Sequence, residues 1–249
     1  MDLLKKAKIR FNQILIENDL LNEEIEVSVR GLTSNEAIGV TERKDFPIIE
    51  GKEVMIEAEF RDSYGQAFTD APNEYKGTLK ELINLPLSEN KNRAVFIAVL
   101  NSVLRNLGFA QKTSHCKNEE PENCSKELID WLCDKNISGK IGLVGYQPAM
   151  LESLSGYFKP ENILISDLNL KNINEMKFGV KVLNGKIENF RLIDNSDYVL
   201  LTGSTIVNGS INNLYEYLED NKKKYSFFGN TISGVAKLIG LPHICFYGR

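Results

Sequence analysis

A histidine and two cysteines lie close together near the middle of the chain, among several carboxylates. The segment from His115 to Cys124 holds one imidazole, two thiols and three carboxyl groups within ten residues. These are the ligand types that a transition-metal or heavy-metal ion prefers. Seven residues separate Cys116 from Cys124, unlike the two-to-four-residue spacing of structural zinc sites. The segment is therefore either a metal site with His115, Cys116, Glu120, Glu122 and Cys124 as ligands, or an ordinary polar loop.

A proline in this segment predicts where a helix begins. With Pro121 at the first helical position, Glu122 and Cys124 would lie in the first turn. The helix dipole there favours the thiolate, which is the form that binds metal. Cys133 lies nine residues beyond Cys124, on the opposite side of that helix, so the two thiols cannot reach one ion from it.

A glycine loop offers a second kind of chemistry. The short apolar strand expected at 141–145 leads into a turn and then a helix that starts near Pro148. Its exposed backbone N–H groups would suit an anionic group, and the residues expected to take part are Gly142, Gly145, Tyr146 and Gln147. The alternative is that the glycines serve only the close packing of a strand against a helix.

Polar residues also follow the next two expected strands. Asp167 ends the strand at 163–167, a position where an acidic side chain often binds ribose hydroxyls in nucleotide or S-adenosylmethionine sites. The strand at 198–203 leads into small hydroxyl and amide side chains that could line the same crevice, or could simply form turns. These residues are Thr202, Gly203, Ser204, Thr205 and Asn208.

Other candidates have simpler explanations. Glu57 and Glu59 alternate along one expected strand and share a face, which fits either a carboxylate pair or the solvated side of a sheet. Residues 65–72 have the composition of an ordered turn, with Asp70 as an Asx-turn residue. His243 follows a proline at the start of the last expected strand, and we interpret it as structural.

The elements that position these residues change in character along the chain. Residues 1–20 have helical spacing, whereas Ile25–Arg30 and Val54–Arg61 alternate between apolar and polar, which is typical of an antiparallel sheet. Pro47 and Gly51 mark a turn between those two strands. Thr78 is expected to cap one helix, and Ser88 a longer one that ends at Gly108.

From residue 139 onward, near-continuous apolar strands alternate with helices, which indicates a parallel sheet covered on both faces. The expected strands are 141–145, 163–167, 198–203, 225–229 and 243–247, with helices near 210–220 and 231–239. The predicted fold is thus an α+β N-terminal domain over residues 1–110, a polar connector over 111–138, and an α/β Rossmann-like domain over 139–249.

Composition excludes several classes of protein. The 249 residues are 42% hydrophobic and 26% charged, with a net charge of −4, which argues against a nucleic-acid backbone as the partner. The longest apolar run is far below the length of a membrane span, and the first residues lack an export signal. Four cysteines are too few for a disulfide scaffold, so we expect a reduced, cytoplasmic protein.

Five motifs in the same order resemble a prokaryotic family labelled for heavy-metal chelation. They are Gly65–Pro72, His115–Cys124, Gly142–Ala149, Asp167–Asn169 and Thr202–Thr205. The resemblance covers nearly the whole chain. It implies an N-terminal domain like that of enolase, followed by a Rossmann-like domain. No enolase barrel is present, so enolase activity does not transfer.

The leading hypothesis is a protein that binds a metal ion or metal complex, or another small-molecule ligand, in a crevice between the two domains. The alternative is an enzyme that binds a nucleotide or S-adenosylmethionine in the Rossmann-like domain. The sequence does not decide which metal or molecule binds or whether a reaction is catalysed. It also leaves the oligomeric state open, a homodimer included.

Overall fold

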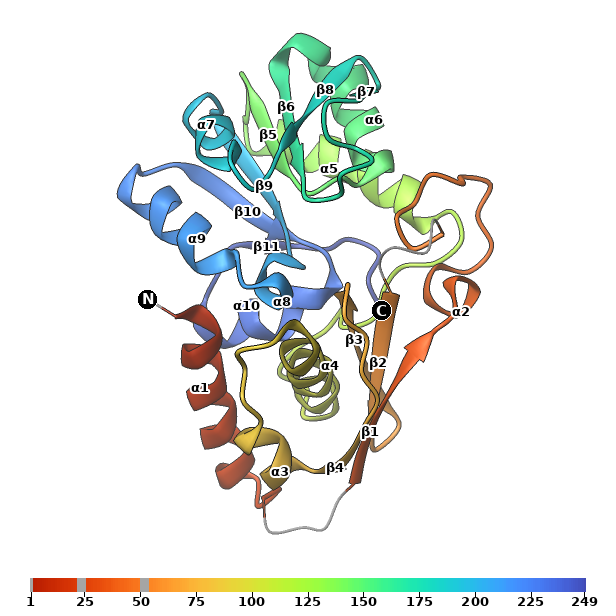
Figure 1. The fold of residues 1–249 in the computed structure, drawn as a ribbon, viewed down its shortest axis with the longest axis vertical. Coiled ribbons are helices and arrows are strands. Elements are labelled where there is room, and N and C mark those ends of the chain that lie inside the picture. The colour runs from red at the N-terminus through yellow and green to blue at the C-terminus, as the bar shows by residue number, and fades with distance from the viewer. Residues whose placement is uncertain (1, 22–25, 50–53) are drawn as a thin grey trace. The chain divides into compact units, whose positions relative to one another are not determined.

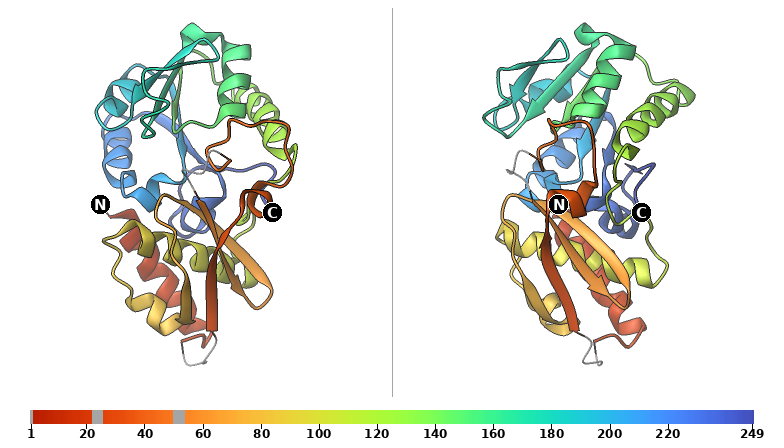
Figure 2. Two further views of the ribbon diagram at one scale, coloured as in Figure 1. Left: turned by 45° about the vertical axis from the view of Figure 1, so that its right-hand side comes forward. Right: turned by 90° about the vertical axis from the view of Figure 1, so that its right-hand side faces the viewer.

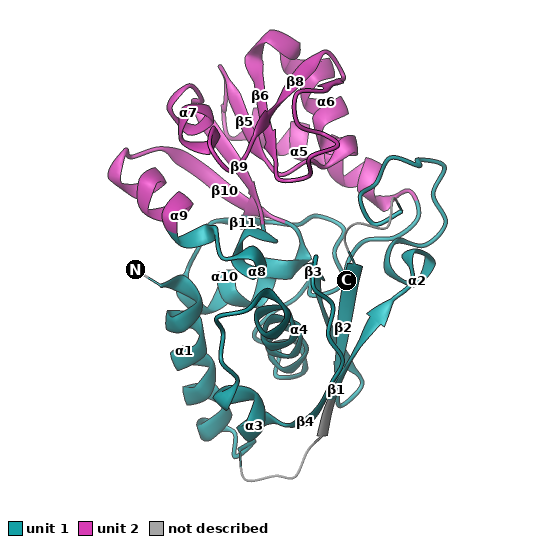
Figure 3. Ribbon diagram, in the orientation of Figure 1, with its two compact units in different colours: residues 1–118, 203–212, 229–249 teal, residues 119–202, 213–228 magenta. Residues whose placement is uncertain are grey.

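The computed structural model describes residues 2–21, 26–49 and 54–249. Ile25 and Gly51, to which the sequence assigned a strand and a turn, lie outside the described residues. The chain divides into two compact units (Figure 3). Unit 1 consists of residues 1–118, 203–212 and 229–249, and unit 2 of residues 119–202 and 213–228. The fold is mixed α/β, with one antiparallel sheet and one mostly parallel sheet.

Unit 1 is built on an antiparallel sheet with the strand order β3-β2-β1-β4. The long helix α4 packs against β2 and β3 (Figures 1 and 2). The elements of this unit are α1 (Leu3–Glu17), β1 (Glu26–Leu32), α2 (Ser34–Ile38), β2 (Val54–Phe60), β3 (Ser63–Thr69), β4 (Tyr75–Thr78), α3 (Leu79–Asn84), α4 (Asn90–Asn106), α8 (Thr205–Asn208), η2 (Asn230–Ile232), α10 (Ser233–Ile239) and β11 (His243–Ile244).

The alternation in residues 54–60 produces the expected strand. Ile56, Ala58 and Phe60 are buried, whereas Glu57 is half-buried and Glu59 is exposed between them. Burying each large apolar side chain contributes about 1.5–3 kcal/mol, so this face holds the strand against the core. The prediction of a strand here is confirmed.

The prediction of a turn at residues 65–72 is wrong for its first half, because Gly65 to Thr69 lie within β3. Gly65 is needed for packing rather than for turning. A Cβ at this position would lie 2.2 Å from the backbone nitrogen of Ser102 and 2.3 Å from the carbonyl oxygen of Ala98, both in α4. The missing side chain lets the helix backbone approach the strand closely.

One of the two predicted helix caps is confirmed. The Thr78 hydroxyl accepts a hydrogen bond from the Glu81 backbone N–H, and the Glu81 carboxylate accepts one from the Thr78 N–H, which forms a capping box. The second cap is wrong, because α4 begins after Glu89 and has no side-chain cap. Ser88 lies before the N-cap, and its carbonyl accepts a hydrogen bond from the Arg93 side chain.

Two segments from the C-terminal half of the chain complete the core of unit 1. The buried Asn101 amide donates to the carbonyl oxygens of Gln66 and Thr231, and its oxygen accepts the Gly234 N–H. These bonds attach η2 and α10 to α4. The units therefore divide the chain differently from the predicted domains, since residues 203–212 and 229–249 are grouped with the N-terminal residues.

Unit 2 contains parallel strands in the order β10-β9-β5-β6-β8, followed by β7, which pairs antiparallel with β8. Its elements are α5 (Glu120–Asp134), β5 (Ile141–Val144), α6 (Pro148–Phe158), η1 (Pro160–Asn162), β6 (Ile163–Asp167), β7 (Met176–Lys177), β8 (Val180–Asn184), α7 (Asn189–Asp194), β9 (Tyr198–Thr202), α9 (Ile211–Asp220, of which 213–220 belong to this unit) and β10 (Lys224–Phe228).

The expected parallel strands at 141–145, 163–167, 198–203 and 225–229 are confirmed within one residue at each end. The expected strand at 243–247 is shorter, because β11 ends at Ile244. The sequence analysis missed β7 and β8. Their residues read Met-Lys and Val-Lys-Val-Leu-Asn, which is too short and too polar to stand out as buried strands.

Candidate functional site

The predicted metal ligands His115 and Cys116 lie in unit 1, next to β3. The chain before them follows this strand, because the Gln66 N–H donates to the Thr113 carbonyl at 2.9 Å and the Thr113 hydroxyl donates to the Tyr64 carbonyl at 2.8 Å. The start of the connector is thus bonded to β3 like a further strand, which fixes the backbone at His115.

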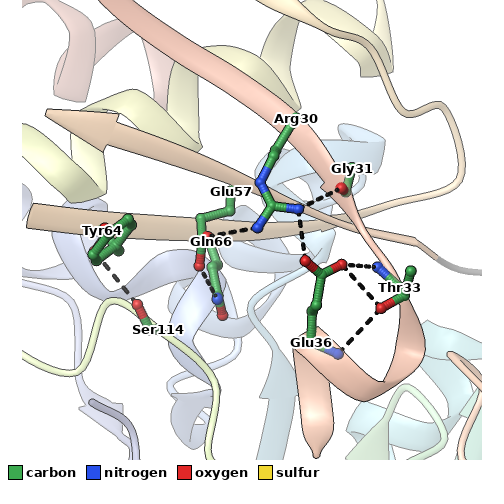
Figure 4. Close-up of polar contacts among 8 residues, drawn as sticks. All are labelled: Arg30, Gly31, Thr33, Glu36, Glu57, Tyr64, Gln66 and Ser114. Atoms are coloured by element: carbon green, nitrogen blue, oxygen red, sulfur yellow. Dashed lines mark hydrogen bonds and ion pairs between the residues drawn. The ribbon is translucent and has the colours of Figure 1, made fainter.

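A line of polar side chains across the sheet supports this backbone. The His115 N–H donates to Gln66 Oε1 at 2.7 Å, and Gln66 Nε2 donates to Glu57 Oε2 at 2.6 Å. Arg30 Nη2 lies 3.8 Å from Glu57 Oε1, and the same guanidinium donates to Glu36 (Figure 4). Gln66 is 2% exposed, so both ends of its amide are satisfied inside the protein.

The imidazole of His115 is held in one tautomer. Its Nδ1 lies 2.5 Å from the Cys116 carbonyl oxygen, and since a carbonyl can only accept, Nδ1 carries the proton. In the neutral ring the lone pair is then on Nε2, the arrangement of a metal-binding histidine. The ring is packed edge-to-face against Phe68, with centroids 5.4 Å apart. Cys116 Sγ is buried and lies 3.9 Å from Nδ1.

The other predicted ligands belong to unit 2, on helix α5. Glu122 lies in the first turn as expected, but the helix begins at Glu120, so Glu120 also lies in the first turn and Pro121 is the second helical residue. Cys124 is then the fifth helical residue and lies beyond the first turn, which corrects the prediction. Within each unit, the described residues contain no group of three or more His, Cys, Asp or Glu side chains that could hold a metal ion.

A second polar cluster lies at the carboxyl edge of the parallel sheet in unit 2. Gly145 follows β5, Asp167 ends β6 and Thr202 ends β9, and these strands are parallel neighbours. Gly145 has a φ of +97°, and a Cβ there would lie 2.6 Å from Thr202 Cγ2. Gly145 therefore allows both the turn and the close approach of Thr202.

Asp167 holds this loop in place. Its Oδ2 accepts the Tyr146 N–H at 2.7 Å, and its Oδ1 accepts the Asn169 N–H at 2.5 Å. Burial raises the pKa of Asp167, although the hydrogen bonds from Asn169 and Tyr146 act in the opposite direction. The Lys177 ammonium lies 5.8 Å from the centre of the Tyr146 ring.

The remaining predicted residues of this cluster have structural roles that the sequence left open. Gln147 caps α6 by accepting the Met150 N–H. Gly142 lies inside β5 rather than in the loop, and a Cβ there would lie 2.5 Å from Ser196 Oγ. Four of the predicted residues belong to unit 1: Gly203, Ser204, Thr205 and Asn208. The Asn208 side-chain oxygen accepts hydrogen bonds from the N–H and the hydroxyl of Ser210.

Sequence reasoning missed Gln66 and Phe68, the two residues that fix His115. Both alternate along β3, which was interpreted as a turn, so their common strand was not recognised. No local signal in the sequence marked Gln66, because its burial becomes visible only once residues 63–69 are recognised as a strand.

The fold and this site define a two-unit α/β protein with a thiol–imidazole pair beside an antiparallel sheet. Residues 127–233 match the model of the family DUF364, whose description is "Putative heavy-metal chelation". The resemblance seen in the sequence motifs is confirmed over this stretch. None of the curated proteins matches the chain.

Two solved structures of this family are similar to the chain. A DUF364 protein of unknown function from Pyrococcus horikoshii has 16% identity and a TM-score of 0.47, covering 90% of this chain and 79% of its own. One from Desulfitobacterium hafniense DCB-2, also of unknown function, has 14% identity and a TM-score of 0.48, covering 75% and 72%. No helix among the described residues is long and apolar enough to span a membrane.

Proposed function

We propose that the protein binds a thiophilic metal ion or a metal complex through His115 and Cys116. The observation that carries this proposal is the hydrogen bond from His115 Nδ1 to the Cys116 carbonyl, which leaves the lone pair on Nε2. Metal-binding histidines commonly donate their other ring N–H to a carbonyl in this way. The description of the matching family supports the same function.

The donor set favours a metal complex over a bare ion. An imidazole and a thiolate are two ligands of the soft or borderline type, whereas a structural zinc ion requires four. A complex that brings ligands of its own needs fewer from the protein. Glu120, Glu122 and Cys124 remain predicted ligands, and the variants below test Cys124 directly.

Binding should depend on pH and on the redox state of the thiols. The Cys116 thiol must lose its proton to bind metal, so binding releases protons and weakens as the pH falls. Oxidation of the thiol removes a ligand. We therefore propose a reducing compartment such as the cytoplasm as the place of action.

The test is a titration of the reduced protein with Zn²⁺ and Cd²⁺. Calorimetry measures the binding of each ion, and ultraviolet absorbance detects the cadmium–thiolate bond. We expect Cys116→Ser to lose the absorbance and His115→Ala to weaken binding. Cys133→Ser is the matched control, because Cys133 is an exposed residue whose thiol donates a hydrogen bond to the Tyr157 hydroxyl. Cys124→Ser, alone and combined with Cys116→Ser, tests whether a second thiol takes part.

Equal metal stoichiometry and affinity in the wild type and Cys116→Ser would contradict the proposal. The enzyme that binds a nucleotide or S-adenosylmethionine would then take its place. It is second because Asp167, which was expected to bind ribose, already accepts hydrogen bonds from three backbone N–H groups and from the Asn172 side chain.

Two finer assignments of the fold also remain proposals. The parallel strands β9, β5 and β6, with a glycine loop at their carboxyl edge, support a Rossmann-like domain within residues 139–249, of which 203–212 and 229–249 are grouped with unit 1. The likeness of residues 1–110 to the N-terminal domain of enolase is supported by the antiparallel sheet packed on α4.

A further inference from the structure

Unit 1 contains a cavity of about 780 Å³ that the metal-binding proposal does not use. It lies between α1, the segment 83–88 and the residues around α8, and we call it the α1 cavity. Its volume falls within the range of about 300–1,000 Å³ that is typical of small-molecule sites.

Of the three cations that line the α1 cavity, Lys5 is exposed, whereas Lys8 and Arg93 are partly buried. In the described part of the chain neither Lys8 nor Arg93 forms an ion pair. Lys8 Nζ donates to the Leu85 carbonyl at 3.1 Å. The Arg93 guanidinium donates to three carbonyl oxygens, at 2.6–2.9 Å, and to the side-chain oxygen of Asn90. All of these acceptors are neutral, so they orient the two cations without neutralising their charge.

Partial burial acts on both cations. Desolvation lowers the pKa of Lys8 and the pKa of Arg93. Asp2 and Asp70 oppose the shift at Arg93 through their charges, and Asp2 is the one acidic residue among the described residues that line the cavity. Its carboxylate already accepts the Lys5 N–H as the cap of α1. A desolvated cation without a direct counter-ion is stabilised when an anion binds beside it.

The rest of the cavity wall is mixed, with apolar residues beside the polar Asn12, Asn84 and Asn212. Ile206 and Ile211 are each 1% exposed, and Ile83 and Pro86 come from the opposite segment. Ile9 at the rim is 57% exposed. Apolar residues beside unneutralised cations fit a ligand with an apolar body and a charged head.

We propose that the α1 cavity binds a small amphipathic organic anion, with a carboxylate beside Lys8 and Arg93 and an apolar body along Ile83, Pro86 and Ile206. A singly charged carboxylate suits this half-buried site better than phosphate, because a doubly charged group costs more to remove from water. The site is independent of His115 and Cys116.

Octanoate is the probe, with 1-octanol and inorganic phosphate for comparison, and calorimetry measures binding. The variant is Lys8→Met, which keeps the length of the side chain and removes its charge. Lys6→Met is the matched control, since Lys6 is an exposed residue of the same helix and does not line the cavity. We expect Lys8→Met to raise the octanoate Kd about tenfold, the loss of one charge-assisted hydrogen bond, and Lys6→Met to leave it within about twofold.

Equal octanoate affinities in the two variants would overturn the proposal, as would the absence of octanoate binding in the wild type. Octanol that binds as tightly as octanoate would overturn the role of charge, and phosphate that binds as tightly would overturn the role of the apolar residues. These wild-type comparisons decide the matter even if Lys8→Met does not fold. His115→Ala should bind octanoate like the wild type, which separates this proposal from the metal-binding one.

Discussion

Gly65→Ala tests how closely α4 must approach the strand that supports His115. The added Cβ would lie 2.2 Å from the Ser102 nitrogen and 2.3 Å from the Ala98 carbonyl oxygen. Real Cβ contacts are essentially never shorter than 3.0 Å, so the helix or strand backbone has to move by about 0.8 Å, the difference between 3.0 and 2.2 Å. Overpacking of a well-packed core costs about 1–3 kcal/mol, and rigid backbone on both sides places this substitution at the upper end.

Gly31→Ala is the matched control, because Gly31 lies in the same sheet and, among the described residues, a Cβ there would meet only Val54 Cγ1, at 4.0 Å. Replacing a strand glycine with alanine at such a position is expected to be neutral or stabilising by up to about 1 kcal/mol. Urea unfolding followed by circular dichroism measures the free energy of unfolding of each variant. Similar values for Gly65→Ala and Gly31→Ala would refute the role of Gly65 in helix–strand packing.

Three further predictions concern hydrogen bonds in unit 1. Gln66→Met should lower the free energy of unfolding by about 2 kcal/mol in urea titrations, because Glu57 loses the Gln66 amide and the half-buried His115 N–H loses its acceptor; a loss below about 0.5 kcal/mol would contradict it. Hydrogen bonds at the start of α2 lower the pKa of Glu36 from 4.5 to about 2, so the stability they add is complete above pH 4.5 and is lost as the pH falls towards 2. Glu36→Gln should remove that part of the acid dependence, and an NMR titration of this carboxyl that gave an ordinary pKa would disprove it. Thr78→Ala should cost about 1 kcal/mol in thermal unfolding, whereas Ser88→Ala, at a position that caps no helix, should cost much less; equal losses would show that the capping box adds nothing.

The parallel strands of unit 2 could be predicted because their signal is local. Residues 163–167 and 198–202 are short apolar runs, each next to turn residues, and burial on both faces requires that composition. β7 and β8 carry lysines because they lie at the far end of the strand order, where the requirement for apolar residues is weaker. They could not be told from a loop by composition.

The grouping of the C-terminal segments with unit 1 could not be predicted either. Asn101 contacts the backbone of Thr231 and Gly234, which are 130 and 133 residues away in the chain. Nothing in the local pattern of residues 229–239 distinguishes a helix that packs on α4 from one that covers the parallel sheet, because both need one apolar face.

The candidate metal site separates into a part that the sequence reveals and a part that it does not. The donor atoms are local: His115 and Cys116 are adjacent, and the hydrogen bond that sets the tautomer joins these two residues. What orients them is not local, since Gln66 lies 49 residues before His115 and occupies a strand whose glycine resembled a turn signal. Residue types therefore identify the chemistry, whereas the rigidity that gives a two-donor site its affinity depends on contacts that only the fold brings together. For this reason Gln66→Met should weaken Cd²⁺ binding although it removes no donor atom, and an unchanged affinity would mean that the backbone at His115 is held by β3 alone.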